Sequence, residues 1–124
     1  MEAEKILIID DDPAMVKSAR QVLEEAGYNV YSMNTGEGVV ERLKLLNPAL
    51  VILDLVLPGE SGFQIAREIM KYKNIPIIMM SLKKEDIDKH VAAVSGAIEY
   101  LEKPVEAEEL LYHVKDVLSG KENT

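Results

Sequence analysis

The chain has 124 residues, and its 22 Asp and Glu outnumber its 14 Lys and Arg, giving a formal net charge of −8. This length predicts one domain with a substantial core, and the negative charge argues against direct binding of nucleic acid, which needs a positive surface. The absence of Cys excludes disulfides and thiolate chemistry. The acidic start is unlike a signal peptide, and no apolar stretch approaches the roughly 20 residues of a membrane span, so we expect a cytoplasmic protein.

Five short apolar runs rich in Ile, Leu and Val are spread along the chain. Because these runs are nearly continuous rather than alternating, most of them are typical of strands that are covered on both faces of a parallel sheet. The expected strands are residues 5–9, 28–32, 50–53, 75–80 and 98–101.

The segments between these runs repeat apolar residues at helical spacing. The expected helices run from Pro13 to a stop at Gly27, over 39–46, over 63–70, around 87–94 and over 105–118, and residues 55–61 are expected to form a loop. Strands that alternate with helices predict an α/β fold, a doubly wound three-layer sandwich with right-handed crossovers. We expect one domain over residues 1–119, followed at 120–124 by a polar tail or the start of a linker.

Charged side chains follow three of the predicted strands. Asp10-Asp11-Asp12 follow the first strand, Asp54 closes the third, and Lys103 comes just after the fifth. Residues beyond the carboxyl ends of parallel strands gather in one crevice, so these groups should meet. Clustered carboxylates suit a hard divalent cation, and a cation beside a lysine suits a phosphoryl group. The sequence therefore predicts a site for phosphoryl transfer.

Simpler interpretations exist for each of these residues. Asp12 before Pro13 is expected to cap the next helix, and the rest of the acidic triplet could share that role. Asp54 lies in an apolar run, where a carboxylate must be paired, solvated or used, and it could cap a loop. Ser81 closes the fourth strand and could cap a helix or donate a hydrogen bond to a phosphoryl oxygen. A cis Lys103–Pro104 bond could aim the lysine inward.

Four segments together resemble the receiver domain of bacterial two-component response regulators. They are ILIIDDDP at 6–13, VILDLVLPG at 51–59, IIMMS at 77–81 and GAIEYLEKP at 96–104. The resemblance extends over essentially the whole chain, in order and with similar spacing. It implies a five-stranded parallel sheet in the flavodoxin-like order 2-1-3-4-5.

The resemblance also implies residue roles. Asp54 would be the phosphoacceptor, and Lys103 would pair with the phosphoryl group. Asp10 and Asp11 would bind Mg²⁺ together with Asp54 and the backbone carbonyl of Val56. Ser81 would bind the phosphoryl group after transfer, and Tyr100 would be the aromatic switch residue that turns inward when Ser81 moves. Without the resemblance, Tyr100 is simply a half-covered aromatic of an edge strand.

By the same resemblance, the phosphoryl group would come from a sensor histidine kinase, a phosphotransfer protein or a small donor. Phosphorylation would change the surface of the fourth helix, fifth strand and last helix, and so control a downstream protein or an attached output domain. A phosphorylation-dependent homodimer is a further expectation. The chain would not be an enzyme, because it would catalyse only its own phosphorylation and dephosphorylation.

Leu82 departs from the family pattern, in which a small residue follows the Ser or Thr. A bulky side chain there predicts restricted access and slow turnover at Asp54. It also supports an alternative, a receiver-like module that binds proteins independently of phosphorylation. A third hypothesis, an aspartate-nucleophile phosphatase, is disfavoured because this length leaves no room for a cap domain or a substrate pocket.

Overall fold

The computed structural model describes residues 3–81 and 99–122 of the chain. Five parallel strands form its main sheet in the order β2-β1-β3-β6-β7. This order is the expected flavodoxin-like one, with the first strand of the chain between the second and third. The strands are β1 (Lys5–Ile9), β2 (Asn29–Met33), β3 (Leu50–Asp54), β6 (Ile77–Ser81) and β7 (Glu99–Glu102).

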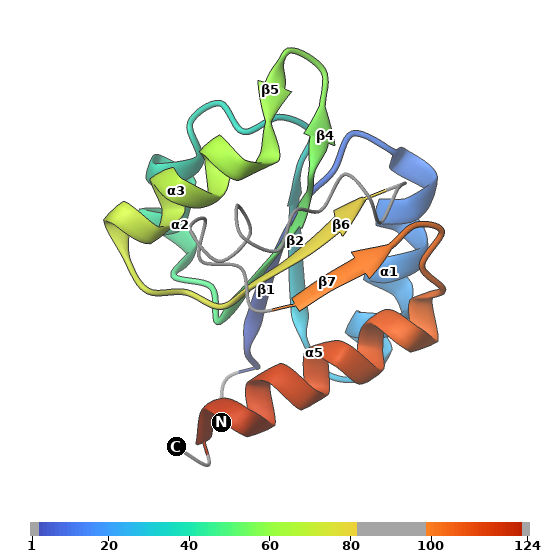
Figure 1. The fold of residues 1–124 in the computed structure, drawn as a ribbon. Helices are drawn as coiled ribbons and strands as arrows, with labels where there is room; N and C mark the ends of the chain where they lie inside the picture. The colour runs from blue at the N-terminus through green and yellow to red at the C-terminus, as the bar shows by residue number, and fades with distance from the viewer. Residues whose placement is uncertain (1–2, 82–98, 123–124) are drawn as a thin grey trace.

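Helices cover both faces of this sheet (Figure 1). On one face lie α1 (Pro13–Glu25) and α5 (Ala107–Glu122), and on the other lie α2 (Val39–Leu46) and α3 (Gly62–Tyr72). The predicted three-layer α/β sandwich is therefore confirmed. The helix expected around 87–94 lies outside the described residues. Within the described ranges, no helix combines the length and the apolar character needed to cross a lipid bilayer.

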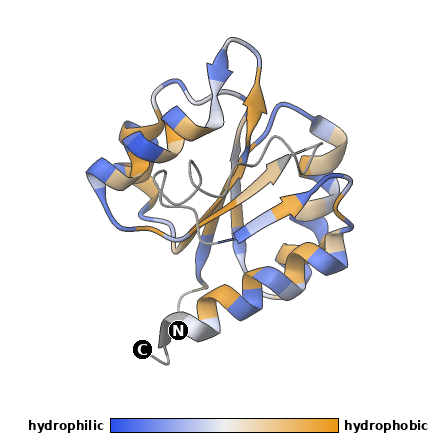
Figure 2. Ribbon diagram, in the orientation of Figure 1, coloured by the Kyte–Doolittle hydropathy of each residue, from blue (hydrophilic) through white to orange (hydrophobic). Residues whose placement is uncertain are grey.

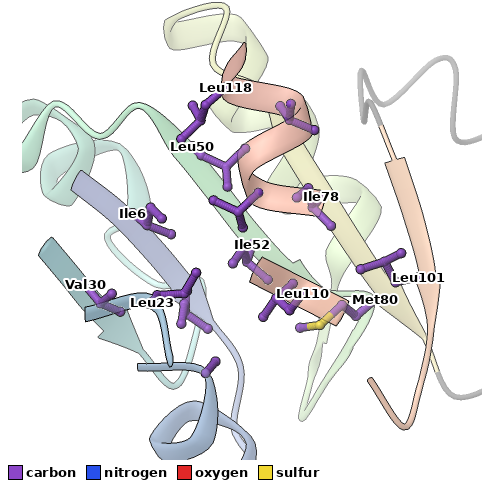
Figure 3. Packing of buried hydrophobic residues seen from close by; sticks show 14 residues of the cluster. Ile6, Leu23, Val30, Leu50, Ile52, Ile78, Met80, Leu101, Leu110 and Leu118 are labelled. Atoms are coloured by element: carbon purple, nitrogen blue, oxygen red, sulfur yellow. The ribbon is translucent and has the colours of Figure 1, made fainter. Parts of the chain in front are cut away.

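Each face of the sheet buries its own apolar core. All five residues of β3 are buried, because helices cover the strand on both sides. Figure 2 shows the inner strands as largely hydrophobic, whereas α5 alternates between hydrophobic and hydrophilic positions. Figure 3 shows the core beneath α1 and α5, where burying each Leu or Ile contributes about 1.5–3 kcal/mol to folding. This core includes Ile6, Leu23, Ile52, Ile78 and Leu110.

The chain passes from β1 into α1 through a well-defined helix cap. Asp12 has an extended backbone, and its side chain accepts hydrogen bonds from the amides of Ala14 and Met15. Pro13 occupies the first helical turn, where no intrahelical partner for its nitrogen is needed. The predicted cap at Asp12 is thus confirmed.

Two segments differ from the predictions. The expected loop at 55–61 contains a small antiparallel hairpin of β4 (Val56–Leu57) and β5 (Glu60–Ser61), which projects at the top of Figure 1. Helix α5 begins at Ala107, after Val105, and extends to Glu122 through the start of the expected polar tail. Its last turn contains the exposed Gly120, whose cost in a helix is only about 1 kcal/mol, so the helix continues past it.

Candidate functional site

Asp10, Asp54 and Lys103 meet at the carboxyl ends of β1, β3 and β7. The Lys103 ammonium donates a hydrogen bond to Asp10 Oδ2 at 3.0 Å and another to Asp54 Oδ2 at 3.2 Å. These contacts join residues 93 and 49 positions apart in the sequence. The parallel sheet creates this meeting point, since its strands all end at the same edge. The peptide bond between Lys103 and Pro104 is cis.

The two buried carboxylates are held in the same way. The second oxygen of each accepts a hydrogen bond from a backbone amide two residues further on: Asp12 N to Asp10 Oδ1 at 2.9 Å, and Val56 N to Asp54 Oδ1 at 3.2 Å. Asp10 is 2 % exposed and Asp54 is 6 % exposed. Within the described part of the chain, no buried side-chain nitrogen or oxygen lacks a hydrogen-bond partner. Both carboxylates are therefore preorganised as acceptors.

Asp11 completes an acidic cluster that faces solvent on one side. Asp10, Asp11 and Asp54 each offer a carboxylate oxygen, and these oxygens lie within 4.8 Å of one another. Asp11 is exposed, unlike the other two. Beside the cluster is an open depression of about 380 Å³, which Asp10 and Asp11 line together with Lys17 and Arg20. Three hard oxygen donors at this spacing, open on one side, fit a divalent cation such as Mg²⁺.

Burial sets the protonation behaviour of the cluster. Desolvation raises the pKa of the Asp54 carboxyl, and the negative charge of Asp10 raises it further, while the Val56 amide and Lys103 oppose the rise. Burial alone would lower the pKa of Lys103, but its hydrogen bonds and attraction to Asp10 and Asp54 outweigh that effect and raise it. Lys103 therefore remains a firmly charged ammonium at neutral pH.

The structure describes three of the four other residues singled out in the sequence. Val56 is in β4, directly beyond Asp54 and Leu55. Tyr100 is half-buried in β7, packed against the core beneath α2 and α3. The backbone of Ser81 ends β6, in register with Glu102 just before the lysine. Leu82 lies outside the described residues.

The sequence analysis missed the link between Glu60 and Gly36. The Gly36 amide donates to both oxygens of the Glu60 carboxylate, at 3.1 and 3.0 Å. This contact ties the loop before α2 to the small hairpin beyond Asp54. The sequence holds no local signal for this contact, because Leu55, Val56 and Leu57 are all apolar and do not alternate, and Gly36 is 24 positions away from Glu60.

Comparison with known proteins places the chain in a family. Residues 6–115 match the model of the response regulator receiver domain. A CheY-like response regulator receiver domain protein from Methanospirillum hungatei JF-1 is 28% identical with a TM-score of 0.89, and the match covers 98% of each chain. The receiver domain of a signal transduction histidine kinase from Syntrophus aciditrophicus is 30% identical with a TM-score of 0.84, covering 98% of this chain and 95% of that one.

A two-component response regulator from Clostridium difficile is 26% identical with a TM-score of 0.84, and the match covers 98% of this chain and 99% of that one. The chain therefore belongs to the response regulator receiver domain family. Receiver domains are signalling modules that work by phosphorylation, interact with histidine kinases and output domains, and bind Mg²⁺ at an acidic cluster of Asp residues. The grouping of Asp10, Asp11 and Asp54 is consistent with such a cluster.

Proposed function

We propose that this receiver domain is a switch activated by phosphorylation of Asp54. The observation that carries the proposal is the Asp54 carboxylate itself, buried beside Asp10 and Asp11 and 3.2 Å from the Lys103 ammonium. An Asp54 oxygen would attack the phosphorus of a phosphohistidine on a sensor kinase or phosphotransfer protein. A new O–P bond would form, the N–P bond would break, and the electron pair would leave with the imidazole nitrogen.

The residues around Asp54 would neutralise and position the charges of this transfer. Lys103 carries a compact ammonium at the right place to bind an oxygen of the incoming phosphoryl group. Asp10, Asp11, Asp54 and the backbone carbonyl of Val56 are the groups that would hold Mg²⁺. When bound, Mg²⁺ supplies positive charge that offsets the negative charge of phosphoryl oxygens.

The response to phosphorylation would pass through Ser81 and Tyr100. The Ser81 hydroxyl would bind the phosphoryl group, and Tyr100 would move further into the core against which it already packs. The new surface would act on a downstream protein, an attached output domain or a second copy of this chain. Leu82 would slow access to Asp54, so a Leu82→Ala variant should gain and lose the phosphoryl group faster.

The proposal is tested by intact mass after incubation with acetyl phosphate and Mg²⁺. We expect the native chain to gain one phosphoryl group that hydroxylamine removes, and Asp54→Asn to gain none. Asp116→Asn is the matched control, because it removes an exposed carboxylate of α5 and should be phosphorylated normally. A native chain that gains no adduct, with acetyl phosphate or with sensor kinases, would refute the switch and favour the phosphorylation-independent interaction module.

A further inference from the structure

The hairpin of β4 and β5 is too small to be stable alone. Each strand has two residues, with Val56 paired to Ser61 and Leu57 paired to Glu60. An isolated two-stranded hairpin is marginally stable even when it is longer, so this one depends on contacts with the rest of the domain. The conformation of Val56, whose amide binds Asp54, therefore depends on what anchors the hairpin.

One anchor of the hairpin is apolar. Leu55 and Leu57 are 6 % and 3 % exposed and belong to the core beneath α2 and α3, whereas Val56 between them is 63 % exposed. This alternation fixes which way β4 faces. In β5, Ser61 is exposed and Glu60 is half-buried, and the strand leads directly into α3, where the Gly62 amide donates to the Leu55 carbonyl at 2.9 Å.

The second anchor is the Glu60 carboxylate. Both of its oxygens accept from the Gly36 amide, which makes this a charge-assisted contact. Gly36 is itself rigidly placed: its carbonyl accepts from the Val39 amide at the start of α2, and Val39 is 2 % exposed. The hairpin is thus tied through Glu60 to a helix that is fixed in the core.

These two segments approach so closely that a side chain at position 36 would require its neighbours to shift. A Cβ added to Gly36 would collide with the Ile65 side chain of α3 and would lie 3.0 Å from Glu60 Oε1. The loop before α2 therefore packs directly against both the hairpin and α3. Tight packing of this kind transmits a displacement of one segment to the other.

We propose that Glu60 is a positioning residue, which holds the hairpin on Gly36 so that Val56 stays aligned beside Asp54 for divalent cation binding. This inference rests on the proposed function, in which the Val56 carbonyl is a Mg²⁺ ligand. Groups that hold a metal ligand in place without touching the metal themselves control the affinity for that metal. The Glu60 tether does this through the backbone of the hairpin.

The test measures the Mg²⁺ dissociation constant by isothermal titration calorimetry in the full chain. Glu60→Ala removes the tether, Glu60→Asp keeps the charge but is one methylene too short to reach, and Glu60→Gln keeps one acceptor for the Gly36 amide. We expect Ala and Asp to weaken Mg²⁺ binding about tenfold, the low end for groups that orient metal ligands, and Gln to stay close to native. Glu68→Gln, an exposed position on α3, is the charge control and should bind normally.

Hydrogen exchange of the Gly36 amide provides a second measurement that does not involve the metal. It should accelerate in Glu60→Ala and Glu60→Asp and remain slow in Glu60→Gln. Native affinity in Glu60→Ala would overturn the inference, and so would a lower urea midpoint without a change in affinity. Weaker Mg²⁺ binding in Glu60→Gln together with native affinity in Glu60→Asp would overturn it too, because the charge of residue 60 and not its contact with Gly36 would then control binding. If the native chain itself fails to bind Mg²⁺ or to be phosphorylated at Asp54, the proposed function fails and this inference fails with it.

Discussion

Asp10 and Asp54 are held by similar hydrogen bonds, yet the segments that follow them differ in construction. At the β1 end (Asp10 to Pro13), the chain enters the 13-residue helix α1 at once, through the Asp12 cap. At the β3 end (Asp54 to Gly62), it enters the two-residue strands of the hairpin. The hydrogen bonds at the β1 end are also shorter, 2.9 and 3.0 Å against 3.2 Å for both at the β3 end.

This difference indicates a division of roles within one site. The β1 end is fixed by a long helix, whose position depends on many buried contacts. The β3 end is fixed by the burial of Leu55 and Leu57, by the Glu60 contact and by the close approach of Gly62. Changes to the contacts that support the β3 end should therefore alter the site itself, whereas changes to the Asp12 cap at the β1 end should mainly alter the stability of the domain.

The largest expected effect is that of Lys103→Met, which removes the cation shared by both ends. Two buried carboxylates then face each other without compensation, and we expect a loss of about 3 kcal/mol in the free energy of unfolding. Urea unfolding in Mg²⁺-free buffer measures it. Added Mg²⁺ should restore part of the loss, and Lys115→Met, at an exposed position of α5, should be close to native. Equal midpoints for the two variants would contradict the prediction.

Gly62→Ala tests the β3 end alone. A Cβ at this position would lie 2.6 Å from Leu55 Cα and 2.8 Å from the Asp54 carbonyl oxygen, and these backbone atoms cannot move without shifting Asp54. We expect a loss of about 2 kcal/mol in the free energy of unfolding, typical of overpacking, together with slower phosphorylation by acetyl phosphate.

The control for this variant is Gly120→Ala, in the last turn of α5, where an added Cβ meets no atom within 4 Å. Alanine there should raise stability by up to about 1 kcal/mol, since it removes the conformational cost of glycine in a helix. Glycine to alanine should thus lower the free energy of unfolding at position 62 and raise it at position 120. A stable, normally phosphorylated Gly62→Ala would show that the hairpin tolerates rearrangement.

Asp12→Ala tests the β1 end. It removes the side-chain acceptor for the amides of Ala14 and Met15, and the loss of such a cap should cost about 1 kcal/mol. The backbone amide of residue 12 remains to bind Asp10, so phosphorylation of Asp54 should persist. Thermal unfolding measures the stability change. Asp116→Ala is the control, because it removes an exposed aspartate within α5 that is not at a helix cap. If Asp12→Ala remains folded but is no longer phosphorylated at Asp54, the cap at the β1 end also controls the site, and the proposed division of roles is wrong.

The smallest expected effect is a gain in the free energy of unfolding, in Asp54→Asn without Mg²⁺. Burial and Asp10 raise the pKa of Asp54, so this carboxylate is less favourable in the folded chain than in the unfolded one. Asparagine relieves that cost while losing the attraction of Lys103, and we expect a net gain of about 0.5 kcal/mol at neutral pH, the scale of one hydrogen bond.

The pH dependence of that gain has a defined sign. Above the ordinary pKa of 3.8, the unfolded chain loses the Asp54 proton while the folded chain keeps it, so native stability falls until the raised pKa is passed. The asparagine variant lacks this fall. Its advantage should be small in acid, grow through that window and then level off, which urea titrations at a series of pH values would reveal. An advantage that shrinks as the pH rises would contradict the raised pKa.

Much of this arrangement could be predicted from the sequence because it depends on long-range order that apolar patterns determine well. Runs such as residues 5–9 and 50–53 indicate strands covered on both faces, and parallel strands bring Asp10, Asp54 and Lys103 together wherever they sit in the chain. The cap at Asp12 was also predictable, because Asp before Pro is a local signal.

The β3 end was harder to predict, for physical reasons. Strands of two residues are too short to show a period, so the sequence predicts a loop where the hairpin lies. Glu60 follows a Pro-Gly turn and looks like an exposed charge, since nothing local indicates that Gly36, 24 positions away, presents its amide. The end of α5 was missed because a last turn of polar residues has no apolar pattern to distinguish it from a tail.

The contacts of Lys103 also have a consequence for folding kinetics. They join residues that are 93 and 49 positions apart. Closing loops of that length costs chain entropy, so we expect these contacts to form only after the rest of the sheet has aligned β1, β3 and β7. We therefore expect these contacts to be absent from the folding transition state. Lys103→Met should then raise the unfolding rate of the domain and leave its folding rate close to native.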